Sequence, residues 1–265
     1  MPEVNNTSNE IGGLVTYSLL VDGTAVSGSI EIVSIETYQE INRITRACLV
    51  IVDGEPEAAN FSVSSSNVFL PGKTIGISLG YDSNNVNVFK GIIISNTQKA
   101  SDDGGLLVVE CRDEAVKMTL DKNSKHYNNI TASDVAETLL GNYGIANTNI
   151  SPATVTHKQL VQYNSSDWDF MISRLDAAGL MCILNNGETR IKKMEATPTG
   201  SNLPVFEFGN NIIEFDGSMD ARAQSGSVVL QSWNYSTQEL ETENAALNLA
   251  NPGGISTDDL GTGQT

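Results

Sequence analysis

Residues 46–54, with the sequence RACLVIVDG, contain the pattern that decides the fold class. Apolar side chains alternate along this run, as at Leu49 and Ile51, and the run ends in Asp53-Gly54, a pair typical of turns. Because successive side chains of a strand point to opposite faces of a sheet, the alternation predicts a β-strand with one buried face.

Similar runs lie on both sides of this one. They are LVTYSLLVDG at 14–23, SIEIVSIETY at 29–38, TIGISLGY at 74–81, NVFKGIIISNTQ at 87–98 and GLLVVECRD at 105–113. No long helical pattern separates them. Six strands within about a hundred residues predict an antiparallel barrel or sandwich.

The spacing becomes helical at residues 131–144. Thr131 with Asp134 forms an N-cap signature, and Gly144 stands where a left-handed residue commonly ends a helix. The apolar residues between them recur at helical intervals, at Val135, Leu139 or Leu140, and Tyr143. This segment is predicted to be a short amphipathic helix.

A second helix is predicted from NSSDWDFMISRL at residues 164–175. Ser166 and Asp169 have capping-box spacing, and Gly179 ends the pattern. One apolar face is expected to contain Trp168, Met171 or Ile172, and Leu175. Residues 180–184 and 189–193 then flank Asn186-Gly187, which predicts a β-hairpin.

The chain is predicted to be mainly β with an α/β insert. A first antiparallel barrel occupies residues 1–125 and is completed by about residues 200–225, while the insert spans 126–199. Strand patterns return at 204–217 and 227–236. Beyond Thr237 the sequence becomes polar and Gly-rich, so residues 226–265 are predicted to start a second barrel or to form a linker.

Composition excludes several classes of partner. Thirty-two acidic residues against fifteen Lys and Arg give a formal net charge of −17. Nucleic acid and anionic membranes attract clustered cations, so neither is an expected partner. No apolar run is long enough for a transmembrane helix, and the polar start MPEVNNTSNEIGG lacks the features of a signal peptide. Synthesis in the cytoplasm is therefore predicted.

Asp167 and Asp169 are the most conspicuous candidates for catalysis, since glycosidic bonds are hydrolysed by paired carboxylates. Residues two apart on a helix point in different directions, however, and acids in a first turn stabilise the helix dipole. Both are therefore interpreted as structural. Asp82 and Asn84 resemble the start of a calcium loop but lack its later ligands, so a turn is predicted.

The remaining reactive residues also favour structural roles. His126 and His157 have no Asp, Glu or Cys at metal-ligand spacing. Gly76 and Gly80 are expected to flank a strand, and no glycine motif has phosphate-binding spacing. Buried thiols are predicted for Cys48, Cys111 and Cys182, and core positions for Trp168 and Trp233.

Four motifs together resemble a known family. They are INRI with ACLVIVDG at 41–54, FLPGKTIGI with GY and VFKGII at 69–93, the TASDV helix at 131–145, and QY with SDWDF, RL and GL at 162–180. This order is similar to that of the valine-glycine repeat (Vgr) spike proteins of contractile injection systems, which are related to contractile phage tail hubs. The resemblance covers about residues 14 to 240.

The resemblance implies a non-enzymatic homotrimer, with no cofactor and no catalytic, cofactor-binding or metal-binding residues. Each subunit would contribute two related barrels, so that three subunits adapt a hexameric inner tube to a three-fold spike. The implied partners are the inner tube ring, the spike tip protein, baseplate proteins and effector cargo, in a particle that punctures a target envelope. Since the family continues well beyond a second barrel, the chain is expected to be a truncated part or a reduced member.

Two alternatives remain from the residues. The chain could be a cell-wall-degrading enzyme of the same machinery, with Asp167 or Asp113 as a catalyst. It could also be a carbohydrate-binding β-sandwich that uses Trp233 or Tyr81 as a stacking platform.

Overall fold

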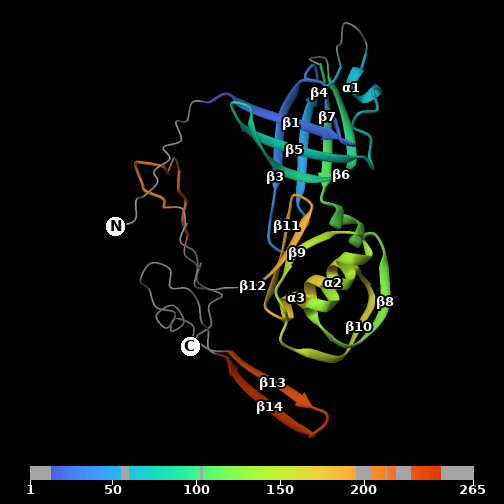
Figure 1. Cartoon of the computed structure of the whole chain (residues 1–265), viewed down its shortest axis with the longest axis vertical. Helices are drawn as coiled ribbons and strands as arrows, with labels where there is room; N and C mark the ends of the chain where they lie inside the picture. The colour runs from blue at the N-terminus through green and yellow to red at the C-terminus, as the bar shows by residue number, and fades with distance from the viewer. Residues whose placement is uncertain are drawn as a thin grey trace. The chain divides into compact units, whose positions relative to one another are not determined.

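The computed structural model describes residues 13–54, 60–101, 104–194, 205–212, 214–218 and 228–245. The chain divides into two compact units, Met1–Met194 and Glu195–Thr265 (Figure 1). The predicted fold class is confirmed, because most of the described elements are antiparallel strands and the two longer α-helices lie in one α/β part of the first unit.

A seven-stranded antiparallel sheet forms one half of the first unit. Its strands are β1 (Val15–Val21), β2 (Thr24–Ala25), β3 (Ile32–Tyr38), β4 (Arg46–Val52), β5 (Thr74–Tyr81), β6 (Asn84–Ser101) and β7 (Gly104–Arg112), with the short helix α1 (Ser62–Ser65) between β4 and β5. The spatial order is β2-β1-β5-β6-β7-β4-β3, and the two end strands are not hydrogen-bonded to each other.

The sheet is curled around a single core. Leu49 of β4 and Val109 of β7 are fully buried in the same cluster as Leu19 of β1 and Ile77 of β5. Strands from both ends of the sheet can share one core only if the sheet bends over it, as β1 and β5 do across β3, β4 and β7 in Figure 1. The result is an incompletely closed barrel, as the alternating sequence predicts.

The glycines of β5 differ from the expectation. Gly76 and Gly80 lie inside the strand rather than at its ends. A side chain at Gly80 would collide with the backbone of Asn84, because the β5–β6 hairpin turns tightly through Asp82 and Ser83, both with positive φ. Gly76 is less restricted, since its nearest neighbour is Leu20 Cβ at 3.9 Å from the added carbon.

The α/β part of the first unit follows β7. It comprises the 3-10 helix η1 (Glu114–Thr119), β8 (Lys122–Thr131), α2 (Ala132–Asn142), β9 (Ala146–Ile150), β10 (Thr156–Ser166), α3 (Asp167–Ala177), β11 (Leu180–Asn185) and β12 (Glu188–Lys193). Strands β8 and β10 form an antiparallel ribbon, and β11-β12-β9 form a separate sheet in which β12 and β9 are parallel. Figure 1 shows α2 and α3 enclosed by the ribbon and this sheet.

Both predicted helices are confirmed, together with their caps. The Thr131 hydroxyl accepts a bond from Asp134 N and the Asp134 carboxylate accepts one from Thr131 N, which completes a capping box. The apolar faces of the helices, including Leu139 of α2 and Met171 of α3, are fully buried in one cluster. The predicted hairpin is also present, with positive φ at its turn residues Asn186 and Gly187.

The second unit is described at residues 205–212, 214–218 and 228–245. Strand β13 (Val228–Asn234) confirms the strand pattern at 227–236, and it pairs with β14 (Glu239–Ala245) as a hairpin. The strand pattern at 204–217 is wrong for its described residues, which contain only an isolated bridge between Phe208 and Ile212. β14 occupies part of the polar sequence beyond Thr237. That residues 200–225 complete the barrel stays a prediction.

Candidate interaction surfaces

Asp167 is a buried structural residue. Its side chain is only 2% exposed and accepts three hydrogen bonds, from Gln162 Nε2 at 2.7 Å, Tyr143 Oη at 3.0 Å and Asn123 Nδ2 at 3.1 Å. These donors lie on β10, at the end of α2 and on β8, so one carboxylate connects several elements. Burial raises the pKa of the Tyr143 phenol, and the hydrogen bond to Asp167 raises it further.

Asp169 has a different role two residues along the same helix. It is exposed, its carboxylate accepts a bond of 2.6 Å from Ser166 Oγ, and its backbone N donates to the same hydroxyl at 3.0 Å. Ser166 is therefore the N-cap of α3, as its spacing predicts. One carboxylate is buried and fully bonded and the other faces solvent, so the two do not form a pair across a substrate position.

The other residues considered for catalysis or metal binding do not cluster in the described structure. His126 lies on β8 and His157 on β10, opposite Val161 and Ile130 respectively. Within the described ranges, no group of three His, Cys, Asp or Glu side chains could hold a metal ion. Asp82 occupies the tight β5–β6 turn, where its Oδ1 accepts a bond of 3.0 Å from Leu14 N. The turn interpretation is confirmed.

The cysteines and tryptophans only partly match their predicted burial. Cys111 and Cys182 are buried, and burial raises the pKa of each thiol to about 12, whereas Cys48 is half-buried. Trp168 packs in the core of the α/β part. Trp233 is 49% exposed on β13, so its predicted core position is wrong for the described chain.

Asn42 connects the barrel to the α/β part within the first unit. Its backbone N donates to Cys182 O at 2.8 Å, and its Oδ1 accepts from Cys182 N at 2.8 Å. Its Nδ2 donates to Asp176 Oδ1 at 2.8 Å. Beside this junction lies a groove of about 930 Å³, lined on one side by the β3–β4 loop and on the other by α3.

The groove has mixed chemistry rather than a reactive centre. Arg46 lies over the Tyr38 ring at 4.1 Å from its centroid, and Arg43 pairs with Glu40 at 3.2 Å. Ile41 and Ile172 contribute apolar surface. Such a lining does not converge polar groups on one point as an active site does.

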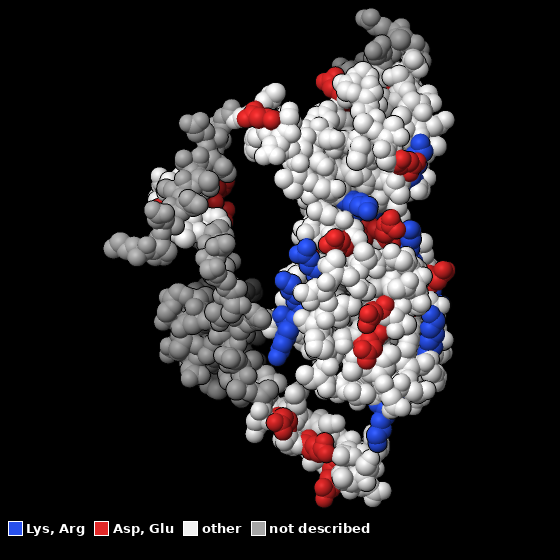
Figure 2. All heavy atoms as spheres, viewed as in Figure 1, with Lys and Arg blue, Asp and Glu red and all other residues white. Residues whose placement is uncertain are grey.

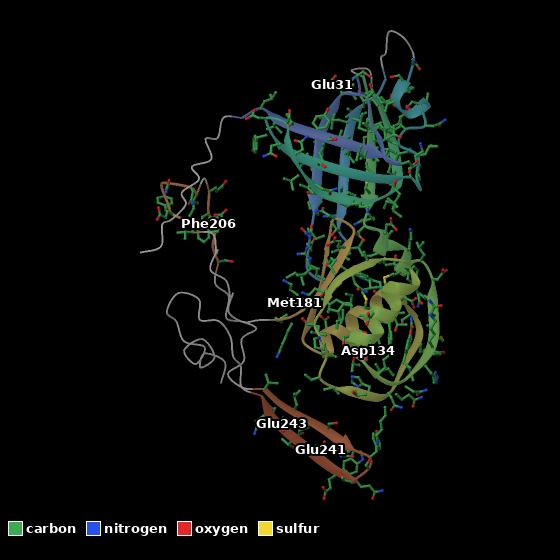
Figure 3. All side chains as sticks on the ribbon, in the orientation of Figure 1. Glu31, Asp134, Met181, Phe206, Glu241 and Glu243 are labelled. Atoms are coloured by element: carbon green, nitrogen blue, oxygen red, sulfur yellow. The ribbon has the colours of Figure 1, made fainter. Side chains whose placement is uncertain are left out.

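The second unit exposes apolar side chains to an unusual degree. None of residues 205–212, 214–218 and 228–244 is buried. Phe208 is 95% exposed and Phe206, labelled in Figure 3, is 71% exposed. The remaining large exposed apolar side chains are Val205, Phe215, Val229, Leu230, Trp233, Tyr235 and Leu240. Apolar surface on this scale marks a region that binds another surface.

The β13–β14 hairpin has two chemically distinct faces. Cross-strand partners share a face, so Trp233 pairs with Leu240 on one side, which carries no charged residue. On the other side Leu230 pairs with Glu243, and Ser232 pairs with Glu241. Figure 2 shows acidic side chains along this hairpin, and Figure 3 labels Glu241 and Glu243.

The outer face of the β11–β12 hairpin has the opposite charge. Leu180, Cys182 and Leu184 point into the core, so Met181 and Ile183 point outward and remain half-buried. Their partners on β12 are Lys192 and Arg190, both exposed. In Figure 2, Lys and Arg side chains gather along the side of the α/β part where β12 lies.

Sequence reasoning assigned no function to either hairpin face. A usable signal existed in β14, where Glu239, Glu241 and Glu243 recur at the two-residue period of a strand. Separately, none of the described helices is long and apolar enough to cross a membrane.

Comparison of the sequence with protein families assigns the chain to one of them. The model of the family described as Alg8 N-terminal domain matches residues 11–264. The chain belongs to this family. No match to the chain's sequence was found among curated proteins.

Solved structures share the fold. The prophage MuSo2 43 kDa tail protein of Shewanella oneidensis has a TM-score of 0.64 at 12% identity, over 94% of this chain and 76% of its own. A tail protein of Neisseria meningitidis MC58 has a TM-score of 0.58 at 17% identity, over 81% of this chain and 64% of its own. The chain thus spans less than two thirds of the second protein.

A third similar structure is the c3393 protein of Escherichia coli, a type VI secretion system component that resembles the T4 bacteriophage tail proteins gp27 and gp5. Its TM-score is 0.52 at 14% identity, over 82% of this chain and 56% of its own. At these identities the likeness establishes the fold alone. The chain therefore has the fold of phage tail proteins and of a type VI secretion system component, as the sequence resemblance implies.

Proposed function

We propose that the chain is a structural hub subunit of the central spike of a contractile injection system. The observation that carries the proposal is the second unit, in which none of residues 205–212, 214–218 and 228–244 is buried and nine large apolar side chains are exposed. An isolated two-stranded hairpin is at best marginally stable in water. This unit therefore needs a partner surface, which an assembly subunit would have.

The proposed assembly is a homotrimer. Three copies, each with two barrel-like domains, would form a ring that adapts a hexameric inner tube to a three-fold spike tip. The partners in this proposal are the tube ring, the tip protein, baseplate proteins and effector cargo, and the particle acts outside the cell that makes it. The fold shared with phage tail proteins supports this role.

The proposal is non-enzymatic. A catalytic carboxylate must reach its substrate, whereas the Asp167 side chain is buried and its three hydrogen bonds are internal. Asp113, the other candidate acid, is also buried and accepts a bond of 2.9 Å from Ala115 N at the start of η1. Both arrangements favour structural roles.

Immunogold electron microscopy of particles from the producing cells tests the proposal. The expected result is gold label at one end of tail-like particles that contain a tube and a sheath. Label found only on free protein would contradict it. A turbidity assay on peptidoglycan addresses the alternative: lysis by the wild-type chain that is abolished in Asp167→Asn would favour a cell-wall enzyme.

A further inference from the structure

The two outward faces of the β11–β12 and β13–β14 hairpins match in layout. On β11–β12, an apolar row of Met181 and Ile183 lies beside a cationic row of Arg190 and Lys192. On β13–β14, the uncharged row of Leu230 and Ser232 on β13 lies beside the acidic row of Glu241 and Glu243 on β14. Each face is thus one uncharged strand next to one charged strand: the β14 row is acidic, and the β12 row contains Arg190 and Lys192 together with one acid, Glu188.

The charges also have the same spacing. Residues i and i+2 of a strand lie on the same face, about 6.8 Å apart. Glu241 and Glu243 have this separation on β14, and Arg190 and Lys192 have it on β12. Two sheets packed face to face can therefore bring both pairs of charges together at once.

The charge distribution along the chain limits where the acidic face can bind within a homo-oligomer. Residues 195–265 contain ten acidic residues and a single basic one, Arg222. The other fourteen Lys and Arg lie in residues 1–194. With a formal net charge of −17, two copies repel in general, so contact requires a local cationic patch. The six-residue strand β12 contains three cations, Arg190, Lys192 and Lys193.

We propose that the β13–β14 hairpin of one copy docks on the β11–β12 face of a second copy, with Glu241 and Glu243 against Arg190 and Lys192. The contact rests on the proposed self-assembly. Arg190 forms only an exposed pair with Glu188 at 3.7 Å, and Glu241 is held on its face by a bond of 2.7 Å from Asn234 Nδ2. The charged side chains of both faces can therefore reach a second copy. In the docked pair, Leu230 would cover Met181 and Ile183.

Cysteine crosslinking between differently tagged full-length copies tests this contact. One copy carries Glu241→Cys and the other carries Lys192→Cys, and the two are mixed under oxidising conditions. Docking raises the local concentration of the two thiols, so about tenfold more crosslinked dimer is expected than in a control in which Lys125→Cys on β8 replaces Lys192→Cys. Wild-type chain measures the background from the native thiols.

Charge reversal provides the second measurement. Glu241→Lys/Glu243→Lys and Arg190→Glu/Lys192→Glu should each weaken self-association at least about tenfold, and all four changes together should restore it to within about threefold. Glu214→Lys/Asp216→Lys, off the hairpin, changes the net charge in the same direction and by the same amount as Glu241→Lys/Glu243→Lys, and it should leave association unchanged. Circular dichroism confirms that each variant is folded.

The outcomes separate the two proposals. Light scattering can show an oligomer while the crosslink is absent, or while the variant with all four charge reversals fails to associate. Either result overturns the hairpin contact and does not contradict the proposed hub. A third sample is a single chain that carries both Glu241→Cys and Lys192→Cys. A crosslink that forms within this chain but not between copies also overturns the hairpin contact, because the hairpin then binds its own chain. A strictly monomeric protein overturns both.

Discussion

The Nε2 atom of Gln162 donates a hydrogen bond of 2.7 Å to Oδ1 of Asp167, and both side chains are buried. Replacing Asp167 with Ala would leave the donors of Gln162, Tyr143 and Asn123 without this acceptor. A buried donor that loses its acceptor costs about 1–3 kcal/mol. Tyr143 and Asn123 are half-buried and Gln162 Nε2 still donates to Ser165 O at 3.1 Å, so the free energy of unfolding should fall by about 3 kcal/mol rather than by three full penalties. Urea unfolding measures the change. Glu137→Ala, at an exposed position on α2, is the control and should shift the value by less than about 0.5 kcal/mol.

Asp169→Ala should have a smaller effect. It removes the carboxylate that accepts from Ser166 Oγ but keeps the bond from Asp169 N to the same hydroxyl. Loss of cap interactions typically costs about 1 kcal/mol, and that is the expected decrease in urea unfolding. A decrease as large as that of Asp167→Ala would contradict the different roles assigned to the two acids.

Gly80 and Gly76 in β5 form a matched pair. A methyl group at Gly80 would collide with the backbone of Asn84, whereas at Gly76 it would have 3.9 Å to Leu20 Cβ. Gly80→Ala is expected to lower the free energy of unfolding by at least about 2 kcal/mol, because backbone must move. Gly76→Ala should leave it unchanged or raise it by up to about 1 kcal/mol. Equal thermal shifts for both variants would be inconsistent with the tight turn.

Asp113 should add a pH dependence to stability. Burial raises the pKa of its carboxyl group in the folded protein, against the opposing effect of the bond from Ala115 N. The folded state then binds this proton more tightly than the unfolded state, so stability falls as pH rises from the ordinary pKa of 3.8 through the raised one.

Asp113→Asn should remove this component, because the amide oxygen can still accept the bond and carries no charge. The unfolding free energy of wild type minus that of Asp113→Asn should decrease as the pH rises through this window. Glu137→Gln, followed over the same pH range, corrects for the loss of one negative charge. A difference that increases with pH would show that Asp113 is stabilised as the anion.

The barrel and the helices were predictable because their signals are local. Alternation at Leu49 and Ile51 reflects one buried face, and the caps at Thr131 and Ser166 depend on residues three positions away. One of the three bonds of Asp167 comes from Asn123, which is 44 positions away, and no local pattern encodes that contact.

The expectations that failed involve context rather than pattern. The apolar residues at 204–217 have strand composition, yet strand formation requires a paired neighbour, and in their described part they have only the bridge between Phe208 and Ile212. The residue type of Trp233 predicts a core position, but none of residues 228–244 of its hairpin is buried. The candidate docking faces depend on cross-strand pairs such as Ser232 and Glu241. Such pairs are set by the register in which two strands align, and the sequence of one strand does not reveal that register.

The mass of the full chain by multi-angle light scattering tests the central claim most directly, measured beside Glu241→Lys/Glu243→Lys. The account predicts a trimer for the wild-type chain and a shift toward monomer for the variant, because the face of the hairpin that docks on a second copy then has the same sign of charge as Arg190 and Lys192. A wild-type chain that remains monomeric at every concentration would contradict the account.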